Sequence, residues 1–221
     1  MTRLRTLWRD PTAAGAAEFA LILPVALLFL LGLIDVGRYG WAYNQLEKAT
    51  QIGARWAAAT TLIPGGETST NGLYNYSFAV LGGVPQGTVV PRNKFPGVTC
   101  AVPDNSVNGN AVCTCKTSFG SCAFDVTADQ TAFTALHNRM AQIYPGIAKN
   151  QFRIDYDWSG LGYSGDPNGA DVQPLITVSM KGSESTNRKR FPLWFMLGRT
   201  VPMPSAYYTI TAEDLRGNYS H

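Results

Sequence analysis

One uninterrupted apolar run constrains the fold of this chain more than any other feature. The run extends from Gly15 to Ile34 (GAAEFALILPVALLFLLGLI), contains Glu18 as its only charged residue, and ends at Asp35. The hydrocarbon core of a bilayer is spanned by roughly 20 apolar residues in helical conformation. Because the run has this length, the sequence predicts a helix that crosses a membrane once.

The charges in front of the run indicate its orientation. Arg3, Arg5 and Arg9 lie just before it. Basic residues next to a spanning helix favour the cytoplasmic side of the membrane. We therefore expect a cytoplasmic N-terminus, a single pass through the inner (cytoplasmic) membrane, and export of the chain that follows Asp35.

Two simpler interpretations of the run remain open. A cleaved signal peptide also has a basic start and an apolar middle, but this run is longer, contains Glu18, and is followed by no A-x-A-like site. A plain anchor, in which Glu18 has no role, is the second alternative. Against it, a carboxylate in a spanning segment costs roughly 2.5–3.5 kcal/mol on insertion scales and usually has a partner.

An amphipathic pattern after the run predicts that the helix continues to about Thr61. Apolar residues recur there near helical spacing, with polar residues between them: Tyr39, Tyr43, Leu46, Ile52, Trp56 and Ala59. We expect this face to lie on the exported domain, because Trp41 and Trp56 do not suit a free-standing stalk. Pro24 should bend the helix.

The chain divides into four parts. We expect a basic leader (1–13), a membrane-spanning helix (14–36), an amphipathic continuation of that helix (37–62) and an exported domain (63–221). The exported part is rich in Gly, Pro, Tyr and Asn and low in charge, which is typical of a loop-rich domain outside the cytoplasm.

The pattern within the exported domain predicts the α+β class. Residues 128–143 carry apolar side chains at helical spacing. Residues 150–157, 173–181 and 205–213 have the alternation of strands. We expect the helix to pack on an antiparallel sheet, with a further strand or short helix near Ser77–Leu81.

The four cysteines lie close together in the exported domain: Cys100, Cys113, Cys115 and Cys122. An even number of cysteines in an oxidising compartment predicts disulfides. A zinc site is the alternative, but the spacing lacks paired C-x-x-C knuckles. A hairpin centred on residues 118–119 would place Cys115 opposite Cys122 and leave Cys113 free to reach Cys100. This geometry favours the pairs Cys100–Cys113 and Cys115–Cys122.

Catalytic and nucleic-acid-binding signals are weak in this sequence. It contains no G-x-S-x-G, H-E-x-x-H or phosphate-loop motif, and His137 and His221 have no nucleophile or carboxylate motif nearby. The formal charge of +3 includes no basic run typical of nucleic-acid binding. The segment from Asp155 to Asp166 has part of an EF-hand spacing, but Asp and Gly are ordinary turn residues, so we expect no metal and no cofactor.

The N-terminal part of the chain resembles TadE-like proteins, which are pilin-like proteins of the tight-adherence (Flp) branch of type IV pilus systems. The resemblance rests on GAAEFALILP followed by GLIDVGRYGWAYNQLEKATQIGARWAA. The matching residues occur in the order of the family signature: Glu18-Phe19, Pro24, Asp35, Gly37-Arg38, Tyr43-Asn44-Gln45-Leu46 and Gly53-Ala54-Arg55.

The resemblance implies processing and assembly through the N-terminal helix. A prepilin peptidase would cut between Ala13 and Ala14, with Gly15 two residues later than the glycine that usually precedes the cut. Glu18, Phe19 and Pro24 would mediate assembly, with Glu18 offsetting the new amino group of Ala14. A helix of about 48 residues would be on the order of 70 Å long, which exceeds what a membrane alone requires.

The resemblance also implies a structural function. We expect a minor pilin, or a pilus-assembly factor acting at initiation or at the tip, and not an enzyme. Its partners would be other pilin-like subunits, prepilin peptidase and an inner-membrane assembly platform, with the protein also present in the extracellular pilus. The alternative is an uncleaved, membrane-anchored binding module at the surface or in the periplasm that does not enter a filament.

A second segment of interest lies near the C-terminus. The basic cluster Arg188-Lys189-Arg190 precedes an apolar patch made of Phe191, Leu193, Trp194, Phe195 and Met196. Three interpretations remain open: buried core beside a solvated loop, a contact with another pilus subunit, or a contact of the exported domain with the membrane surface.

Overall fold

A computed structural model describes residues 11–66, 69–106, 109–167, 169–182, 185–194 and 198–212. The arginines of the leader, Phe195, Met196 and His221 lie outside these described residues. The chain forms two compact units. The first contains residues 1–42 with 190–202, and the second contains residues 43–189 with 203–221.

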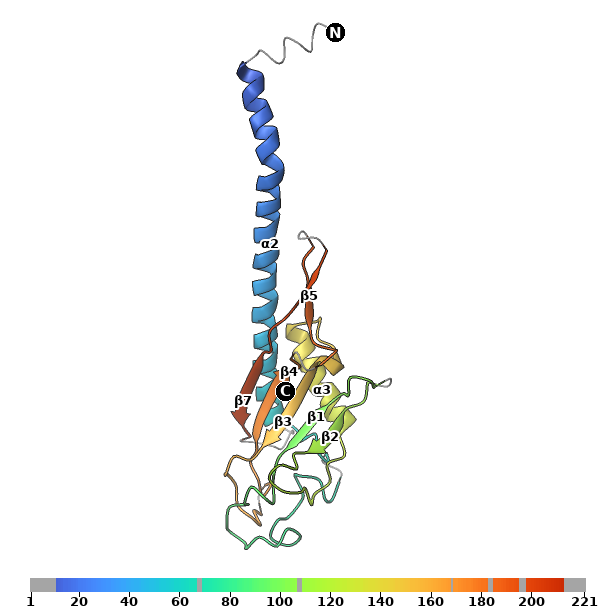
Figure 1. The fold of residues 1–221 in the computed structure, drawn as a ribbon. Coiled ribbons are helices and arrows are strands. Elements are labelled where there is room, and N and C mark those ends of the chain that lie inside the picture. Colours follow the sequence, from blue (N-terminus) through green and yellow to red (C-terminus); the bar gives the residue numbers. More distant parts are fainter. Residues whose placement is uncertain are drawn as a thin grey trace. The chain divides into compact units, whose positions relative to one another are not determined.

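A single long helix, α2 (Pro11–Ala58), contributes to both units (Figure 1). Proline is well tolerated in a first helical turn because its missing N–H has no intrahelical partner there. The helix continues through Pro24 over its 48 residues. It ends at Ala58, where the N–H of Ala59 donates to the Trp56 carbonyl in a closing turn. The predicted long N-terminal helix is confirmed.

The second unit contains a five-stranded antiparallel sheet of order β2-β1-β3-β4-β7. Its strands, in chain order, are β1 (Val98–Ala101), β2 (Val112–Cys115), β3 (Phe152–Asp157), β4 (Leu175–Met180) and β7 (Tyr207–Thr211). Phe152, Ile154 and Tyr156 alternate along the central strand β3 and are fully buried. This alternation is the period of a strand with one face on the core.

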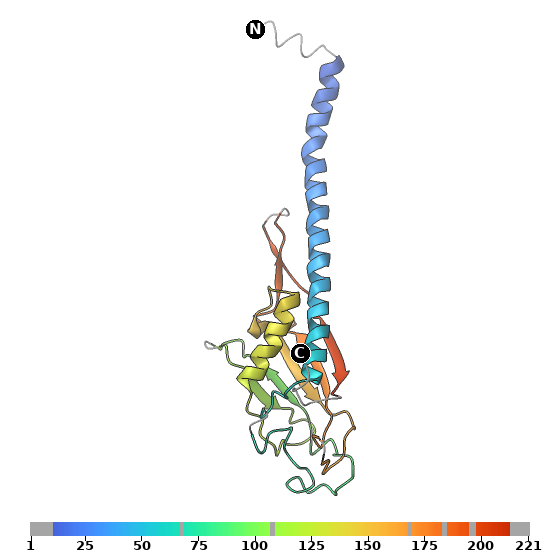
Figure 2. The ribbon, with the colours of Figure 1, turned by 180° about the vertical axis from the view of Figure 1, so that it is seen from behind.

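Two helical segments cover one face of this sheet, as Figure 2 shows: α3 (Gln130–Ile143) and the last turns of α2. The side chain of Asp129 caps α3 by accepting hydrogen bonds from the N–H groups of Thr131 and Ala132, a standard helix start. The ring of Phe133 on α3 stacks on Phe152 with centroids 5.0 Å apart. A short 3₁₀ turn, η1 (Lys149–Gln151), leads into β3. The predicted α+β class is confirmed.

The face that α2 turns to the core agrees only in part with the predicted face, because Leu46 is buried but Tyr43, Ile52 and Ala59 are only half-buried. Trp41 is 68% exposed and Trp56 is only half-buried. The buried positions within the second unit are mostly small residues: Leu46, Ala49, Gly53, Ala54, Ala57 and Ala58. A Cβ on Gly53 would lie 2.8 Å from Met140 Cγ. Small residues are therefore required because α3 approaches α2 closely.

The cysteine region also departs from the predicted geometry. The partner of β2 is β1 rather than a strand beyond residues 118–119, and Cys100 lies directly opposite Cys113. Cys115 and Cys122 instead close a turn after β2. Two disulfides form, Cys100–Cys113 and Cys115–Cys122, which are the pairs favoured from the sequence. The segment Ser77–Leu81 forms turns rather than a strand or helix.

A two-stranded sheet belongs to the first unit. It is a hairpin of β5 (Arg190–Pro192) and β6 (Thr200–Pro202), with Phe191 opposite Val201. The hairpin interrupts the chain between β4 and β7, and its sequence contains the apolar patch identified above.

Candidate functional site

The apolar part of α2 exposes almost all of its side chains. From Gly15 to Leu30 every side chain is exposed. The most apolar window of the helix has a mean hydropathy of 2.6 and is only 6% buried. By length and composition, α2 is able to cross a membrane. A surface of this kind requires lipid or other apolar helices around it.

The residues predicted for assembly lie within this exposed part of α2. Glu18 is exposed among apolar neighbours, and Phe19 is 65% exposed. At about 100° per residue, Phe19 and Pro24 lie about 100° and 240° around the helix from Glu18. The three residues therefore share a short length of helix but not one face.

The predicted processing positions lie in the first turns of the same helix. Ala13, Ala14 and Gly15 have helical backbone. No heavy atom lies within 4 Å of a Cβ built on Gly15, apart from the helix's own backbone and its chain neighbours. The backbone at this position is thus not covered by another described part of the chain.

Asp35 is a residue whose role the sequence reasoning missed. Its side chain is fully buried and pairs with the Arg38 guanidinium at 3.2 Å. Opposite charges three residues apart lie on the same helix face, so the spacing was a usable signal. In the sequence, Asp35 stands out only as the end of the apolar run and as part of the family signature.

Aromatic residues surround this ion pair in the first unit. The Phe191 ring meets Tyr39 edge-on at 5.7 Å, and the Tyr39 hydroxyl donates to the Pro202 carbonyl at 3.4 Å. The Arg38 guanidinium lies over Phe191 and over Trp194, 5.5 and 4.6 Å from the ring centroids. Phe191 is buried, whereas Trp194 is 68% exposed. Within the apolar patch, Phe191 is therefore packed inside the protein, whereas Trp194 lies at the surface.

The cysteine cluster carries no metal-binding capacity. All four cysteines are in disulfides, so the zinc alternative is wrong. Groups of three or more His, Cys, Asp or Glu side chains placed to hold a metal do not occur among the residues that the structure describes.

In the segment with EF-hand-like spacing, Asp155 and Asp157 make contacts with other residues of the chain. Asp155 lies in β3 and accepts a hydrogen bond from Thr99 Oγ1 at 2.6 Å. Lys116 Nζ lies 3.0 Å from the Asp155 carboxylate and 2.7 Å from that of Asp157. Carboxylates neutralised by a lysine and held in a strand do not form a calcium loop, which supports the interpretation as ordinary structure.

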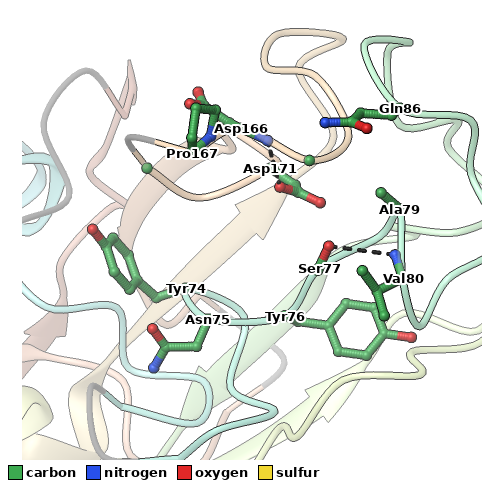
Figure 3. A pocket seen from close by; sticks show the side chains of 12 residues that line it. Tyr74, Asn75, Tyr76, Ser77, Ala79, Val80, Gln86, Asp166, Pro167 and Asp171 are labelled. Carbon is green, nitrogen blue, oxygen red and sulfur yellow. Dashed lines mark hydrogen bonds between the residues drawn. The ribbon is translucent and has the colours of Figure 1, made fainter.

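An open pocket of about 430 Å³ lies between two loop regions of the second unit (Figure 3). Its lining includes Tyr74, Asn75, Gln86, Asp166 and Asp171. The Asp171 carboxylate is buried and accepts hydrogen bonds from the N–H groups of Phe78 at 2.6 Å and of Asp166 at 3.1 Å. This carboxylate therefore fixes the two loops to each other.

His137 has a structural position on α3. Its Nε2 lies 3.0 Å from the Ile147 carbonyl, and its ring stacks on Phe152. These contacts join the middle of α3 to the turn that precedes β3 and to the first residue of that strand.

Comparison with known proteins gives a family match at the N-terminus. Residues 13–55 match the family described as TadE-like protein. The match confirms the resemblance that the sequence suggested, and it falls entirely within α2. No curated protein and no solved structure matches the chain.

Proposed function

From the TadE-like match of residues 13–55, we propose that this chain is a structural, non-enzymatic component of a tight-adherence pilus system. The family indicates an association with such pili. Within it, we propose the role of a minor pilin or of an assembly factor acting at pilus initiation or at the tip. The single observation that carries the proposal is that the match coincides with a helix whose apolar run is exposed.

The physical basis of the proposed assembly is the exposed run itself. A helix that is apolar on all sides requires apolar surroundings. A bilayer supplies these before assembly, and a bundle of similar helices supplies them in a filament. Van der Waals packing and interhelical polar contacts, rather than the hydrophobic effect, then determine which helices associate.

Glu18 supplies the polar contact in this proposal. Cleavage between Ala13 and Ala14 would create a positively charged amino group four residues before Glu18. An unpaired ion in hydrocarbon is costly. Pairing of Glu18 with that amino group, on its own or a neighbouring subunit, would fix the register between helices. The partners are then other pilin-like subunits, with prepilin peptidase and an inner-membrane assembly platform acting earlier.

The native N-terminus and the associated proteins together test this proposal. The full-length chain would be purified from membranes of its own host with a C-terminal tag. Mass spectrometry should find Ala14 as the first residue and pilin-like proteins among the co-purified chains. An N-terminus at Met1 or Thr2 with no pilin-like partner would contradict the proposal and favour the uncleaved, anchored binding module.

A further inference from the structure

The β5–β6 hairpin of the first unit contacts α2 around Tyr39. Phe191 on β5 packs against Tyr39, and the Tyr39 hydroxyl reaches the Pro202 carbonyl on β6. Beyond the paired strands, the N–H of Leu193 donates to the Arg199 carbonyl at 2.8 Å. Both strands of the hairpin therefore contact α2 at the level of Tyr39.

This level of α2 coincides with the end of the apolar run. Arg38 lies four residues after Ile34, the last residue of the run, which corresponds to about 6 Å along the helix axis. The polar layer on each side of the hydrocarbon core is about 5–8 Å thick. With residues 15–34 in the core, the Arg38 guanidinium lies in the headgroup layer, and the Trp194 ring lies 4.6 Å from it.

The chemistry of the hairpin matches this layer. Trp194 is 68% exposed, and tryptophan concentrates at membrane interfaces because its ring is apolar and its N–H is polar. Arg190 donates to Thr200 across the hairpin, and Arg199 is exposed. We propose that the β5–β6 hairpin is a second membrane contact, in which Trp194 enters the headgroup layer and Arg38, Arg190 and Arg199 bind anionic phospholipids.

The charge balance favours lipid over another protein helix as the occupant. Asp35 is the carboxylate at this level in the described part of the first unit, and it is buried and paired with Arg38. The exposed charge is therefore positive, which complements lipid phosphates. An apolar pilin helix would offer no acceptor to the exposed Arg199 and no phosphate to Arg38 and Arg190. The proposal requires that α2 crosses a membrane, but it does not require that the chain enters a pilus.

Photocrosslinking in defined vesicles tests the contact directly. The full-length chain would be reconstituted into phosphatidylcholine vesicles containing phosphatidylglycerol, with p-benzoylphenylalanine replacing Trp194 or, as the control, Trp41. The two tryptophans are equally exposed, at 68% each. Trp41, however, lies about 10 Å past Ile34 along the helix, beyond the headgroup layer. We expect phospholipid adducts from position 194 and several-fold fewer from position 41.

Removing one positive charge tests the role of the arginines. An Arg199→Gln variant should lower the lipid-adduct yield at position 194 by up to about fivefold in vesicles containing phosphatidylglycerol. The yield should change little in vesicles of phosphatidylcholine alone. Retention of both disulfides, read from mobility without reducing agent, shows that each variant is folded.

The alternative outcomes are distinct. Adducts from position 194 to a second protein chain would show that the hairpin is a protein-docking surface and overturn the proposal. Equal lipid yields at positions 194 and 41, or a yield insensitive to Arg199→Gln in both vesicle types, would also overturn it. Purified vesicles contain no pilus components. A negative result in them would therefore contradict the membrane contact of the hairpin, but it would not contradict the proposed function in a pilus.

Discussion

Two carboxylates on α2 have opposite surroundings. Asp35 is buried and is balanced by Arg38 one turn later. Glu18 is exposed within the apolar run, and no described side chain pairs with it. Because a buried or lipid-facing carboxylate requires a partner, Asp35 is satisfied by its own chain, whereas Glu18 requires another group. The difference indicates an internal structural role for Asp35, and it is the reason that we propose an intermolecular role for Glu18.

The Asp35 side chain should be needed to hold the hairpin. It positions Arg38, whose guanidinium lies over Phe191 and Trp194. We expect Asp35→Asn to weaken attachment of the hairpin to α2 by about 1–2 kcal/mol, through loss of a charge-assisted hydrogen bond and a weaker cation–π contact. The measurement is the rate of trypsin cleavage after Arg199 under native conditions, which should rise roughly tenfold.

Glu47→Gln is the matched control for this experiment. Glu47 is exposed on the same helix within the second unit, and surface changes of this kind are usually within about 0.5 kcal/mol. An unchanged cleavage rate in the Asp35→Asn variant would show that the ion pair does not support the hairpin.

At the scale of elements, the contact of α2 with α3 depends on a missing side chain. A Cβ on Gly53 would approach Met140 Cγ to 2.8 Å and Sδ to 3.1 Å. We expect Gly53→Leu to lower the free energy of unfolding by about 1–3 kcal/mol, as overpacking of a filled core does. Urea unfolding of the full chain in detergent measures this change.

An open glycine on the same helix provides the control for Gly53. A Cβ on Gly40 would meet nothing within 4 Å, so Gly40→Ala should be neutral or stabilising by up to about 1 kcal/mol. If Gly53→Leu were as well tolerated as Gly40→Ala, the close approach of the two helices would be refuted.

The two disulfides should both contribute to the second unit. They join cysteines that are 13 and 7 positions apart in the sequence. In the chain-entropy model, loops of this size stabilise by about 3 and 2 kcal/mol. We expect Cys100→Ala with Cys113→Ala to lower the unfolding free energy more than Cys115→Ala with Cys122→Ala, because the first bond also joins β1 to β2. The reverse order in urea unfolding would contradict this assignment.

At the scale of the whole molecule, ion pairs join segments that are distant in sequence. Asp104, after β1, accepts hydrogen bonds from Lys181 Nζ at 2.6 Å and Ser185 Oγ at 2.7 Å. These contacts, led by Lys181, lower the pKa of the Asp104 carboxyl well below its usual range. The end of β4 and the chain beyond it are thereby tied to the loop that leaves β1.

The lowered pKa of Asp104 predicts a pH dependence of stability. Because the folded-state pKa lies below the unfolded value near about 4, the contact is stabilising above about pH 4. This contribution should be lost as the pH falls toward the folded-state pKa. Asp104→Asn and Lys181→Met should each flatten the acid part of the unfolding profile, measured by urea titrations between neutral and acid pH. An acid slope equal to that of the wild type in both variants would refute this contribution.

Much of this architecture could be predicted from the sequence, because strong local patterns specify it. The apolar run of Gly15–Ile34 favours a helix, and the alternation at residues 150–157 favours a strand. The small-residue face at Gly53 could not be predicted, since it depends on how closely α3 approaches. The pairing of β1 with β2 depends likewise on a strand outside the local hairpin pattern. The contacts of Arg38 with Phe191 and Trp194 could not be predicted either, because these aromatic residues are far away in the sequence.

The role of Glu18 in association is the central claim of this account, and co-purification tests it most directly. Tagged full-length chains carrying Glu18→Ala, or Glu47→Ala as the control, would be isolated from membranes and their pilin-like partners quantified. We predict that the Glu18→Ala variant inserts and accumulates normally but loses most of its partners, whereas the control retains them. Partner recovery at the wild-type level with Glu18→Ala would contradict the account.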